Sequence, residues 1–550
     1  MRIALAQLNY IIGDFDRNVS LIKQNILKAK ESGAELIVFS ELNICAYPPQ
    51  DFLEFDDFIL KCYAAAEVIA KDCIGIAAII GLPVRNKKLE GKNLFNAALV
   101  LSDGKIADEV HKALLPTYDI FDEYRYFEPE HTFHCINFKG IKIALTICED
   151  LWNIEDDPMY ITSPMDMLIK EKPKLMINIA ASPFDHSHAE TRKAILKRNA
   201  LKYDLPLIYV NHVGAQTEII FDGGSVGMNA NGTIVHELNY FHEDFSIFDF
   251  DANRGLLTSA ELSPVIKHDH TKIAIIHDAL ILGIKDYFGK QNFKKAILGL
   301  SGGIDSALVT YLASKALGPE NVHTILMPSE FSSKGSIDDS LDLLKTLGVS
   351  HDIIPIKDLL DQYLLSLKPI FKDLPFSIAE ENIQARIRGG LLMAESNKFG
   401  YILLNTSNKS EISVGYGTLY GDMCGGLSVI GDIYKTQVFE LCRYINRNGV
   451  IIPENILTKP PSAELRPNQK DSDSLPEYDI LDKVLFEYIE NRRGPSEIIS
   501  MGFDEALVRR VLKMVNTNEY KRHQTPPILR VSPKAFGKGR RMPIVGRYLS

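Results

Sequence analysis

The chain has 550 residues, too many for one hydrophobic core, and this length predicts two to four domains. Hydrophobic residues make up 46% of the chain and charged residues 24%, which is typical of an ordinary globular protein. The net charge of −10 at pH 7 argues against general nucleic-acid binding.

The cysteines and the apolar runs exclude two further classes of protein. None of the seven cysteines forms a Cys-x-x-Cys pair, so the sequence indicates neither a zinc site nor a disulfide framework. Scattered thiols fit a reducing compartment, and we expect a cytoplasmic protein. No apolar run approaches the length of a membrane span, and the first residues read as a strand rather than a signal peptide. We therefore expect no membrane partner.

Strands and helices alternate over the first 250 residues. Apolar spacing predicts an amphipathic helix over 18–30, and a second helical stretch covers 188–203. A hairpin is expected around 221–225. Short apolar runs predict buried strands at 2–8, 36–39, 75–84, 94–101, 141–147, 174–179 and 205–210. Strands that alternate with helices and hairpins favour an αββα sandwich.

Three residues of this half carry groups that amide chemistry uses, and each stands where an apolar strand meets a loop: Glu41, Lys112 and Cys148. Amide cleavage needs a nucleophile, a proton shuttle and a donor for the developing oxyanion. A thiolate, a carboxylate and an ammonium meet those needs, and a nearby lysine would favour the thiolate. Each residue alone also has a plain structural explanation, as a core cysteine, a cap or a surface lysine.

The neighbours of these residues resemble motifs of the nitrilase superfamily. The segments are Phe39-Ser-Glu41-Leu, Lys112-Ala-Leu-Leu-Pro116-Thr-Tyr118 and Ile147-Cys148-Glu149-Asp150-Leu-Trp152. The resemblance implies that Glu41 is the general base and acid, Lys112 stabilises the tetrahedral oxyanion and Cys148 forms a thioester. It also implies that Glu123 is a supporting carboxylate. Tyr118 and Ser182 would lie at the glutamine pocket. His186 and His188 follow Ser182, but two imidazoles without a third ligand are more often solvated.

Periodicity is lost after residue 251, where Pro264 and the segment His268-Asp-His270 stand. We assign 1–255 to the first domain, 256–271 to a linker and 272–550 to the second domain. A helix over 273–288 opens the second domain.

The apolar run 296–300 ends at Ser301-Gly-Gly-Ile-Asp-Ser306, and a helix is predicted over 306–316. A strand, a glycine turn and a helix N-terminus point several backbone N–H groups at one anion. No Gly-Lys-[Ser/Thr] follows, so this is not a Walker A loop. The loop suits pyrophosphate, with Asp305 holding a divalent cation such as Mg²⁺. The alternative is an ordinary glycine turn after a buried strand.

The second half continues as a doubly wound, Rossmann-like parallel α/β sheet, with strands at 321–327, 351–355 and 401–404 and a helix at 336–347. Ligands bind such sheets at the carboxyl ends of the strands. Glu411, which follows the last strand, is a candidate for a second Mg²⁺ carboxylate or for a first-turn residue that satisfies a helix dipole. Lys435 near the start of a helix is unfavourable for the dipole, which points to a phosphate partner.

The 301–306 loop resembles that of the N-type ATP pyrophosphatases. Together with five other segments it resembles the family of glutamine-dependent NAD⁺ synthetases, over nearly the whole chain. These segments are Glu381-Asn-Ile-Gln-Ala-Arg386-Ile-Arg388-Gly389, Asn408-Lys-Ser-Glu411, Tyr420-Gly-Asp422-Met, Lys459-Pro-Pro-Ser-Ala-Glu464-Leu-Arg-Pro467 and Lys521-Arg522-His-Gln524-Thr-Pro-Pro527. The resemblance implies that ATP adenylates deamido-NAD⁺ and that ammonia from glutamine displaces AMP to give NAD⁺. Glutamate and pyrophosphate are the other products.

The same resemblance implies the ligands of individual residues. ATP would contact Ser301, Gly302, Gly303, Asp305, Ser306, Thr406 and Lys435. Deamido-NAD⁺ would contact Arg388, Glu411 and Lys521, and Mg²⁺ would be held by Asp305 and Glu411. The resemblance further implies a homo-oligomer and an enclosed route for ammonia.

Two alternatives stay open at this point. One is glutamine-dependent amidation of a different carboxylate, which the nitrilase type of glutaminase disfavours. The other is a nitrilase-family amidase with a regulatory nucleotide-binding module. The presence of Asp305, Glu411 and Lys435 together disfavours a degenerate module of this kind.

Overall fold

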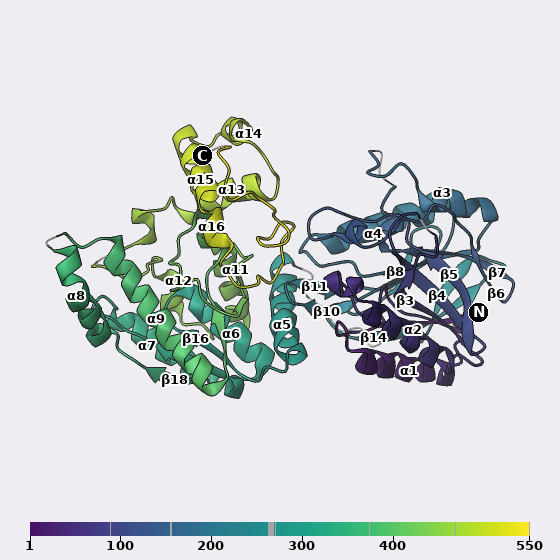
Figure 1. The fold of residues 1–550 in the computed structure, drawn as a ribbon, viewed down its shortest axis with the longest axis horizontal. Helices are drawn as coiled ribbons and strands as arrows, with labels where there is room; N and C mark the ends of the chain where they lie inside the picture. The colour runs from purple at the N-terminus through teal and green to yellow at the C-terminus, as the bar shows by residue number, and fades with distance from the viewer. Residues whose placement is uncertain are drawn as a thin grey trace. The chain divides into compact units, whose positions relative to one another are not determined.

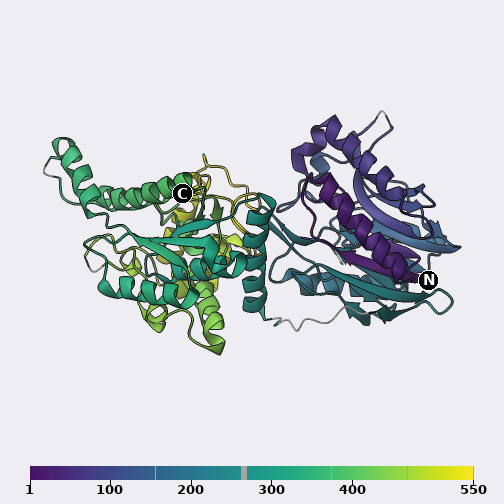
Figure 2. The same cartoon turned by 90° about the horizontal axis from the view of Figure 1, so that it is seen from below.

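The computed structural model describes residues 1–88, 90–154, 157–261, 269, 271–372, 374–467 and 469–548. The chain forms two compact units, Met1–His268 and Asp269–Ser550 (Figures 1 and 2). Within the described part of the chain, no helix has both the length and the apolar character needed to cross a membrane.

The first unit contains two large sheets. One has the strand order β15-β14-β1-β2-β3-β4-β5 and the other the order β13-β12-β9-β8-β7-β6. The strands of the first sheet are β1 (Arg2–Gln7), β2 (Leu36–Val38), β3 (Ala77–Arg85), β4 (Leu94–Ser102), β5 (Lys105–His111), β14 (Asp244–Asp251) and β15 (Leu256–Glu261). Those of the second are β6 (Ile136–Phe138), β7 (Ile141–Ile147), β8 (Leu175–Ala180), β9 (Leu207–Asn211), β12 (Val226–Met228) and β13 (Ile234–Glu237).

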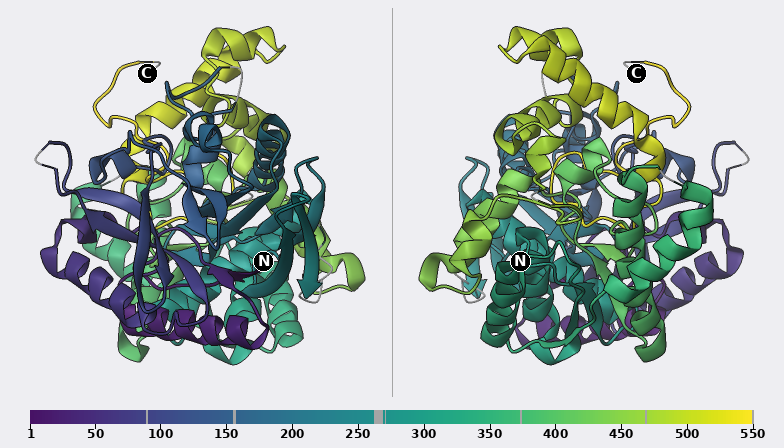
Figure 3. Two further views of the ribbon diagram at one scale, coloured as in Figure 1. Left: turned by 90° about the vertical axis from the view of Figure 1, so that its right-hand side faces the viewer. Right: turned by 90° about the vertical axis from the view of Figure 1, so that its left-hand side faces the viewer.

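Residue alternation in β1 explains how the layers stack. Ile3 and Leu5 pack in a core shared with residues of β7, β8 and β9, whereas Ala4 and Ala6 pack in a second core. Successive side chains of a strand point to opposite faces, so one face of the first sheet meets the second sheet. The other face is covered by α1 (Phe15–Glu31) and α2 (Asp56–Ala70). The helices α3 (Pro164–Leu168) and α4 (His188–Tyr203) belong to the second sheet's side (Figure 3). The αββα prediction is confirmed.

Two details of this unit differ from the sequence prediction. The hairpin is formed by β10 (Val213–Gln216) and β11 (Ile219–Asp222), so its turn lies before, not within, 221–225. Gly223 and Gly224 instead carry the chain from β11 to β12 with positive φ angles of 74° and 63°. The predicted linker begins with a strand, since β15 pairs with β14. Residues 262–268 and 270 of that linker lie outside the described residues.

The second unit is built on a five-stranded parallel sheet with the order β18-β17-β16-β19-β20. Its strands are β16 (Ala296–Gly299), β17 (Val322–Leu326), β18 (Ser350–Ile353), β19 (Ile402–Asn405) and β20 (Leu427–Ser428). The strand order switches sides at β16, because β17 and β18 lie on one side of it and the later strands β19 and β20 lie on the other. Such a switch point opens a crevice at the carboxyl ends of the strands. The doubly wound prediction is confirmed.

Helices cover this sheet and form a smaller lobe near the C-terminus. The helices α8 and α9 pack on the face that carries Ile297, Ile325 and Leu403. The lobe holds a separate core from α10, α13, α14 and α15. The helices are α5 (Lys272–Lys290), α6 (Ile304–Leu317), α7 (Lys334–Leu347), α8 (Lys357–Phe371), α9 (Ile378–Phe399), α10 (Lys409–Val414), α11 (Lys435–Ile445), α12 (Glu454–Thr458), α13 (Tyr478–Ile489), α14 (Pro495–Ser500), α15 (Glu505–Thr517) and α16 (Glu519–Arg522).

Candidate functional sites

The first candidate site is a buried charge cluster in the first unit. Glu41 follows β2, Lys112 follows β5, and Cys148 follows β7. The side chains of Glu41 and Lys112 are completely buried, and Cys148 is 5% exposed. Lys112 is therefore no surface lysine.

Lys112 holds two carboxylates together. Its Nζ atom donates to Glu41 Oε1 at 2.7 Å and to both oxygens of Glu123 at 2.8 Å. Tyr47 donates its hydroxyl to Glu123 Oε1 at 2.9 Å. Glu41 is fixed from two more directions, by Asn96 Nδ2 at 2.7 Å on Oε1 and by the backbone N–H of Ala181 at 2.9 Å on Oε2. With both oxygens engaged, the Glu41 carboxylate has one defined orientation.

Burial and charge decide the protonation states in this cluster. Burial alone would lower the pKa of Lys112, but Glu123 and Glu41 outweigh it and raise that pKa well above the usual value. Burial raises the pKa of Glu123 to about 7, although Lys112 opposes the rise. Lys112 is therefore a stable ammonium with carboxylate partners that share its charge.

Lys112 favours the thiolate of Cys148, but other effects outweigh it. Burial, followed by the charge of Glu41, raises the pKa of the Cys148 thiol well above its usual value, and the opposing effect of Lys112 is too small to reverse this. The resting group is a thiol, so a base must take its proton at the moment of attack.

Asp150 ties the loop of Cys148 to the loop of Lys112. Its carboxylate accepts hydrogen bonds from the backbone N–H of Ile147 at 3.0 Å, of Ala113 at 3.0 Å and of Leu114 at 2.9 Å. Cys148 itself has a φ of 43°, which lies in the left-handed region. Such backbone strain persists where the surroundings impose it. Burial raises the pKa of Asp150 to about 6.

Tyr118 and Ser182, which are predicted to bind glutamine, lie beside this cluster. They contact Glu149 and His188, to which the sequence analysis gave no role. Tyr118 donates its hydroxyl to Glu149 Oε1 at 3.0 Å, and Tyr160 donates to the same atom at 3.0 Å. Ser182 Oγ lies 2.8 Å from Nε2 of His188, whose ring stacks on Trp152. Glu149 directly follows Cys148 in the sequence, and this position could have indicated that Glu149 belongs to the site.

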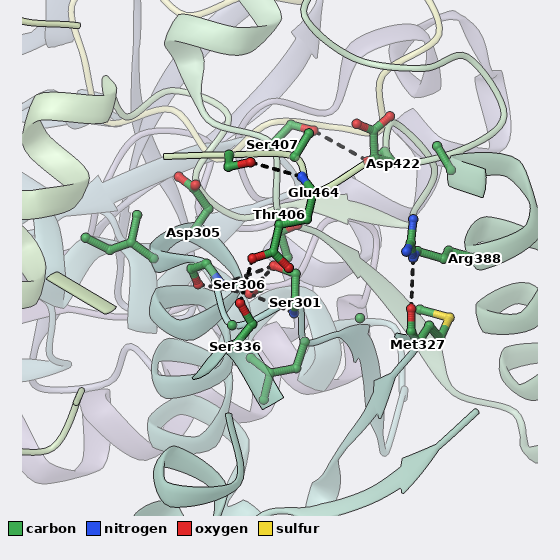
Figure 4. A pocket seen from close by; sticks show the side chains of 18 of the residues that line it. Ser301, Asp305, Ser306, Met327, Ser336, Arg388, Thr406, Ser407, Asp422 and Glu464 are labelled. Atoms are coloured by element: carbon green, nitrogen blue, oxygen red, sulfur yellow. Dashed lines mark hydrogen bonds between the residues drawn. The ribbon is translucent and has the colours of Figure 1, made fainter. Parts of the chain in front are cut away.

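The second candidate site is a cavity of about 290 Å³ at the switch point of the parallel sheet (Figure 4). The 299–306 segment lines one wall, and the ends of β17 and β19 line another. Segments from α7, α9 and the 459–465 stretch close it. The sequence-predicted residues that line it are Ser301, Gly302, Gly303, Asp305, Ser306, Arg388, Thr406, Glu411 and Lys435.

The Ser301–Ser306 loop has the geometry of an anion cradle. The hydroxyls of Ser301 and Ser306 lie 3.2 Å apart, and Gly303 donates its N–H to Ser301 Oγ at 3.2 Å. Gly302 has a φ of +78°, and a Cβ atom there would lie 2.4 Å from the Ser336 carbonyl oxygen. Only glycine fits at this position. The loop ends at α6, whose N-terminus adds its dipole.

Two carboxylates share one ammonium on the other side of this loop. Lys435 Nζ contacts Asp305 Oδ2 and lies 3.6 Å from Glu411 Oε1. Asn408 donates from Nδ2 to Asp305 Oδ1 at 3.0 Å and caps α10 by accepting the N–H of Glu411 at 3.0 Å. Burial and the charge of Asp305 raise the pKa of Glu411 to about 8. Glu411 is thus a first-turn helix residue and also faces Asp305 across a cation.

The donor set formed by Asp305 and Glu411 fits Mg²⁺. Mg²⁺ takes one or two protein carboxylates and completes its shell with water and phosphate oxygens. The ammonium of Lys435 already lies between these two carboxylates, which shows that the pair accepts a cation.

Arg388 and Lys521 occupy different surroundings. Arg388 lines the cavity and donates from Nε to the carbonyl of Met327 at 3.1 Å (Figure 4). Burial lowers the pKa of Arg388 to about 10. The Nζ atom of Lys521 donates to the carbonyls of Gly415 and Gly417 at 2.8 and 2.9 Å, and Lys521 does not line this cavity.

A further polar cluster in the cavity escaped the sequence analysis. Glu464 Oε1 accepts hydrogen bonds from Ser336 Oγ at 2.8 Å and from Lys459 Nζ at 2.6 Å. Lys459 Nζ also contacts Ser336 Oγ. The segment that holds Lys459 and Glu464 was recognised as a motif, but nothing in its residues indicated that it reaches α7.

Comparisons with known proteins identify both units. A carbon-nitrogen hydrolase family model matches residues 2–256, and an NAD synthase model matches residues 276–525. The glutamine-dependent NAD(+) synthetase of Synechocystis sp. is 46% identical over 549 residues, which span 98% of this chain and 98% of that protein. That of Thermotoga maritima is 39% identical over 580 residues, 100% of this chain and 99% of that protein.

A solved structure agrees with these matches. The glutamine-dependent NAD⁺ synthetase from Acinetobacter baumannii, in complex with adenosine diphosphate, is 37% identical with a TM-score of 0.78. The match covers 99% of this chain and 98% of that one.

Proposed function

The chain belongs to the family of glutamine-dependent NAD(+) synthetases, and we propose that it converts deamido-NAD⁺ to NAD⁺ with ammonia from glutamine and energy from ATP. The observation that carries this proposal is that one chain holds both a buried Glu41–Lys112–Cys148 cluster and a Ser301–Ser306 anion cradle. We assign residues 1–255 to the glutaminase domain and residues 272–550 to the synthetase domain.

In the glutaminase half, Glu41 takes the proton of the Cys148 thiol while the sulfur attacks the side-chain amide carbon of glutamine. Lys112 donates to the developing oxyanion, and the buried site makes this charge–charge contact strong. Glu41 then passes the proton to the leaving nitrogen, which departs as ammonia. Water hydrolyses the thioester, with Glu41 again as the base, and glutamate leaves.

Glutamine recognition is assigned to Tyr118 and Ser182. The Tyr118 hydroxyl donates a hydrogen bond to the buried carboxylate of Glu149, and Ser182 Oγ lies within hydrogen-bond distance of Nε2 of His188. Burial raises the pKa of Glu149, and the α-ammonium group of a bound glutamine would offset this by favouring the charged carboxylate. Glu123 keeps Lys112 in place rather than contacting substrate.

In the synthetase half, ATP binds with its phosphates over the Ser301–Ser306 loop. The nicotinate carboxylate of deamido-NAD⁺ attacks the α-phosphorus, pyrophosphate leaves, and ammonia then displaces AMP from the acyl adenylate. Lys435 and the N-terminus of α6 neutralise phosphate charge, and Thr406 and Arg388 line the nucleotide side. A relative that binds adenosine diphosphate supports an adenine nucleotide as ligand.

Asp305 and Glu411 would hold a Mg²⁺ ion at this site. Such an ion would supply positive charge for the phosphates and for the charge that develops on the leaving pyrophosphate. Lys521, held by two backbone carbonyls, is assigned an indirect contribution to deamido-NAD⁺ binding through the 415–417 turn.

The expected cellular setting follows from the thiols. All seven cysteines are free, which supports a reducing, cytoplasmic compartment. A homo-oligomeric assembly stays a prediction.

Product analysis tests the function. The protein is incubated with ATP, Mg²⁺, deamido-NAD⁺ and glutamine, and the nucleotides are separated. The expected products are NAD⁺, AMP, pyrophosphate and glutamate in equal amounts. Release of ADP and phosphate, or glutamate without any NAD⁺, would contradict the proposal.

A further inference from the structure

Three potential metal ligands converge at a second place in the synthetase unit. They are His323 at the start of β17, Asp352 in β18 and Glu395 near the end of α9, and none of them lines the nucleotide cavity. One ligand atom from each lies within 4.8 Å of the other two. We propose that these three side chains bind a divalent transition-metal ion, with Zn²⁺ as the best chemical match.

The strand register explains why these groups meet. In the parallel pair of β17 and β18, His323 lies opposite Ser350, and Asp352 lies two residues further along β18. Side chains two residues apart share a face, so Ser350 and Asp352 both stand on the face of His323. Glu395 reaches the same face from α9, the helix that packs on it.

The distances match a small metal ion. The Nε2 atom of His323 lies 3.2 Å from Asp352 Oδ2 and 3.8 Å from Glu395 Oε2. Bonds of about 2.0–2.2 Å to a tetrahedral Zn²⁺ place neighbouring ligand atoms about 3.3–3.6 Å apart. The observed separations bracket that range, so small side-chain rotations suffice to close the shell.

Hydrogen bonding around the cluster also supports a bound cation. Glu395 Oε2 is buried and accepts no hydrogen bond from any described residue. A buried carboxylate oxygen without a donor is costly, and a bound cation would satisfy it. His323 Nδ1 lies 2.9 Å from Ser350 Oγ, which fixes the ring and leaves Nε2 facing the two carboxylates. Metal-binding imidazoles are commonly oriented in this way by their second nitrogen.

Burial leaves an entry path on one side only. The side chains of His323 and Glu395 are 16% and 18% exposed, whereas Asp352 is 62% exposed. A metal can therefore enter past Asp352, where water supplies the fourth ligand. An imidazole ligand favours Zn²⁺ over Mg²⁺, so Mg²⁺ at the concentrations that support catalysis does not displace it.

The ion would join α9 and β17, which both line the nucleotide cavity, to β18. Arg388 on α9 and Met327, which follows β17, are already linked by a hydrogen bond at the cavity. Glu395 also lies on α9, and His323 also lies on β17. The metal therefore stabilises the α9–β17 pairing at a second point.

Equilibrium dialysis of the full chain against Zn²⁺ with excess Mg²⁺ tests the proposal. Bound zinc per chain is measured for the wild type and for His323→Gln, Glu395→Gln and Asp352→Asn. The expected result is a loss of one bound Zn²⁺ per chain in each of the three variants, and a Zn²⁺-induced rise in Tm that only the wild type shows in full. Asp352→Asn changes an exposed side chain, so this variant folds even if a buried substitution does not.

His351→Gln is the matched control. His351 is exposed on the same strand, next to Asp352, but its side chain points to the opposite face. This variant is expected to bind as much zinc as the wild type. If the three site variants also bind as much zinc as the wild type, the cluster is only a hydrogen-bonded histidine between two carboxylates, and the proposal is wrong.

Discussion

Lys112 Nζ lies 2.7 Å from Glu41 Oε1, and both side chains are buried. Two further bonds of 2.8 Å join the same ammonium to Glu123. Buried charges of this kind contribute little net stability as a set, but removing one member leaves the others unpaired at a high cost. Such an arrangement is therefore better explained by the chemistry of Cys148 than by stability.

Glu41→Gln tests the proton carrier. Glutamine keeps the size of the side chain and can still accept the N–H of Ala181, but it cannot take the Cys148 proton. Release of glutamate from glutamine is expected to fall about 10²- to 10⁴-fold. NAD⁺ formation from added ammonium chloride is expected to stay at the wild-type rate, which serves as the control for folding. Wild-type glutamate release in this variant would rule out Glu41 as the base.

Asp150 predicts a pH dependence of stability. Its pKa is raised by burial to about 6 in the folded chain, so the folded state binds the proton more tightly than the unfolded state. The stability that this group contributes is fully present below its unfolded pKa and is lost as the pH rises through about 6.

The comparison with Asp150→Asn isolates this effect. Between pH 4.5 and pH 7, the free energy of unfolding of the wild type relative to the variant is expected to fall by about 2 kcal/mol. Urea unfolding at a series of pH values gives this difference. The variant is less stable throughout, because an amide NH₂ faces backbone N–H groups, so only the slope with pH is compared. A difference that rises with pH would contradict the assignment.

The sequence predicted the strand-end positions of Glu41, Lys112 and Cys148 because apolar runs end visibly at each of them. It could not predict that Cys148 is a thiol at rest. Protonation depends on burial by chain segments far away in sequence, and Ala181, which binds Glu41, is 140 residues from it. The strand β5, with Lys105, Asp108 and Glu109, was missed because a half-exposed edge strand has no apolar run.

In the second unit, the sequence predicted the phosphate-binding loop but not the residues that pack around it. The order of Ser301, Gly302 and Asp305 reveals a turn that exposes backbone N–H groups. The contacts of Lys435 with Asp305 and of Lys459 with Ser336 join segments more than a hundred residues apart. Lys435 is predicted to face phosphate, and the fold also gives it two carboxylates.

Gly302→Ala tests the shape of the phosphate loop. A methyl group at a φ of +78° is strained, and it would also lie 2.4 Å from the Ser336 carbonyl oxygen. The free energy of unfolding of the synthetase unit is expected to fall by about 1–3 kcal/mol, and ATP binding to weaken. Thermal unfolding and nucleotide titration measure both effects.

Gly390→Ala is the control for this substitution. Gly390 lies in α9 with nothing within 4 Å of the added methyl group. Alanine there is expected to stabilise the helix by about 0.5–1 kcal/mol and to leave ATP binding unchanged. Equal effects of the two substitutions would contradict the described loop geometry.

Asp305→Asn and Glu411→Gln test the carboxylate pair. Each change removes one ionisable carboxyl group beside Lys435 and one oxygen ligand for Mg²⁺. NAD⁺ formation is expected to fall about 10²-fold or more with either glutamine or ammonia as nitrogen source. Glutamate release is expected to continue, because the glutaminase chemistry uses other residues. A variant that keeps full synthesis would remove its residue from the proposed metal site.

We propose that one unit releases ammonia and the other consumes it. The most direct test is Cys148→Ala, assayed for NAD⁺ formation with glutamine and, separately, with ammonium chloride. Synthesis from glutamine is expected to fall to background, and synthesis from ammonia is expected to stay at the wild-type rate. A folded variant that still makes NAD⁺ from glutamine, or that loses both activities, would contradict it.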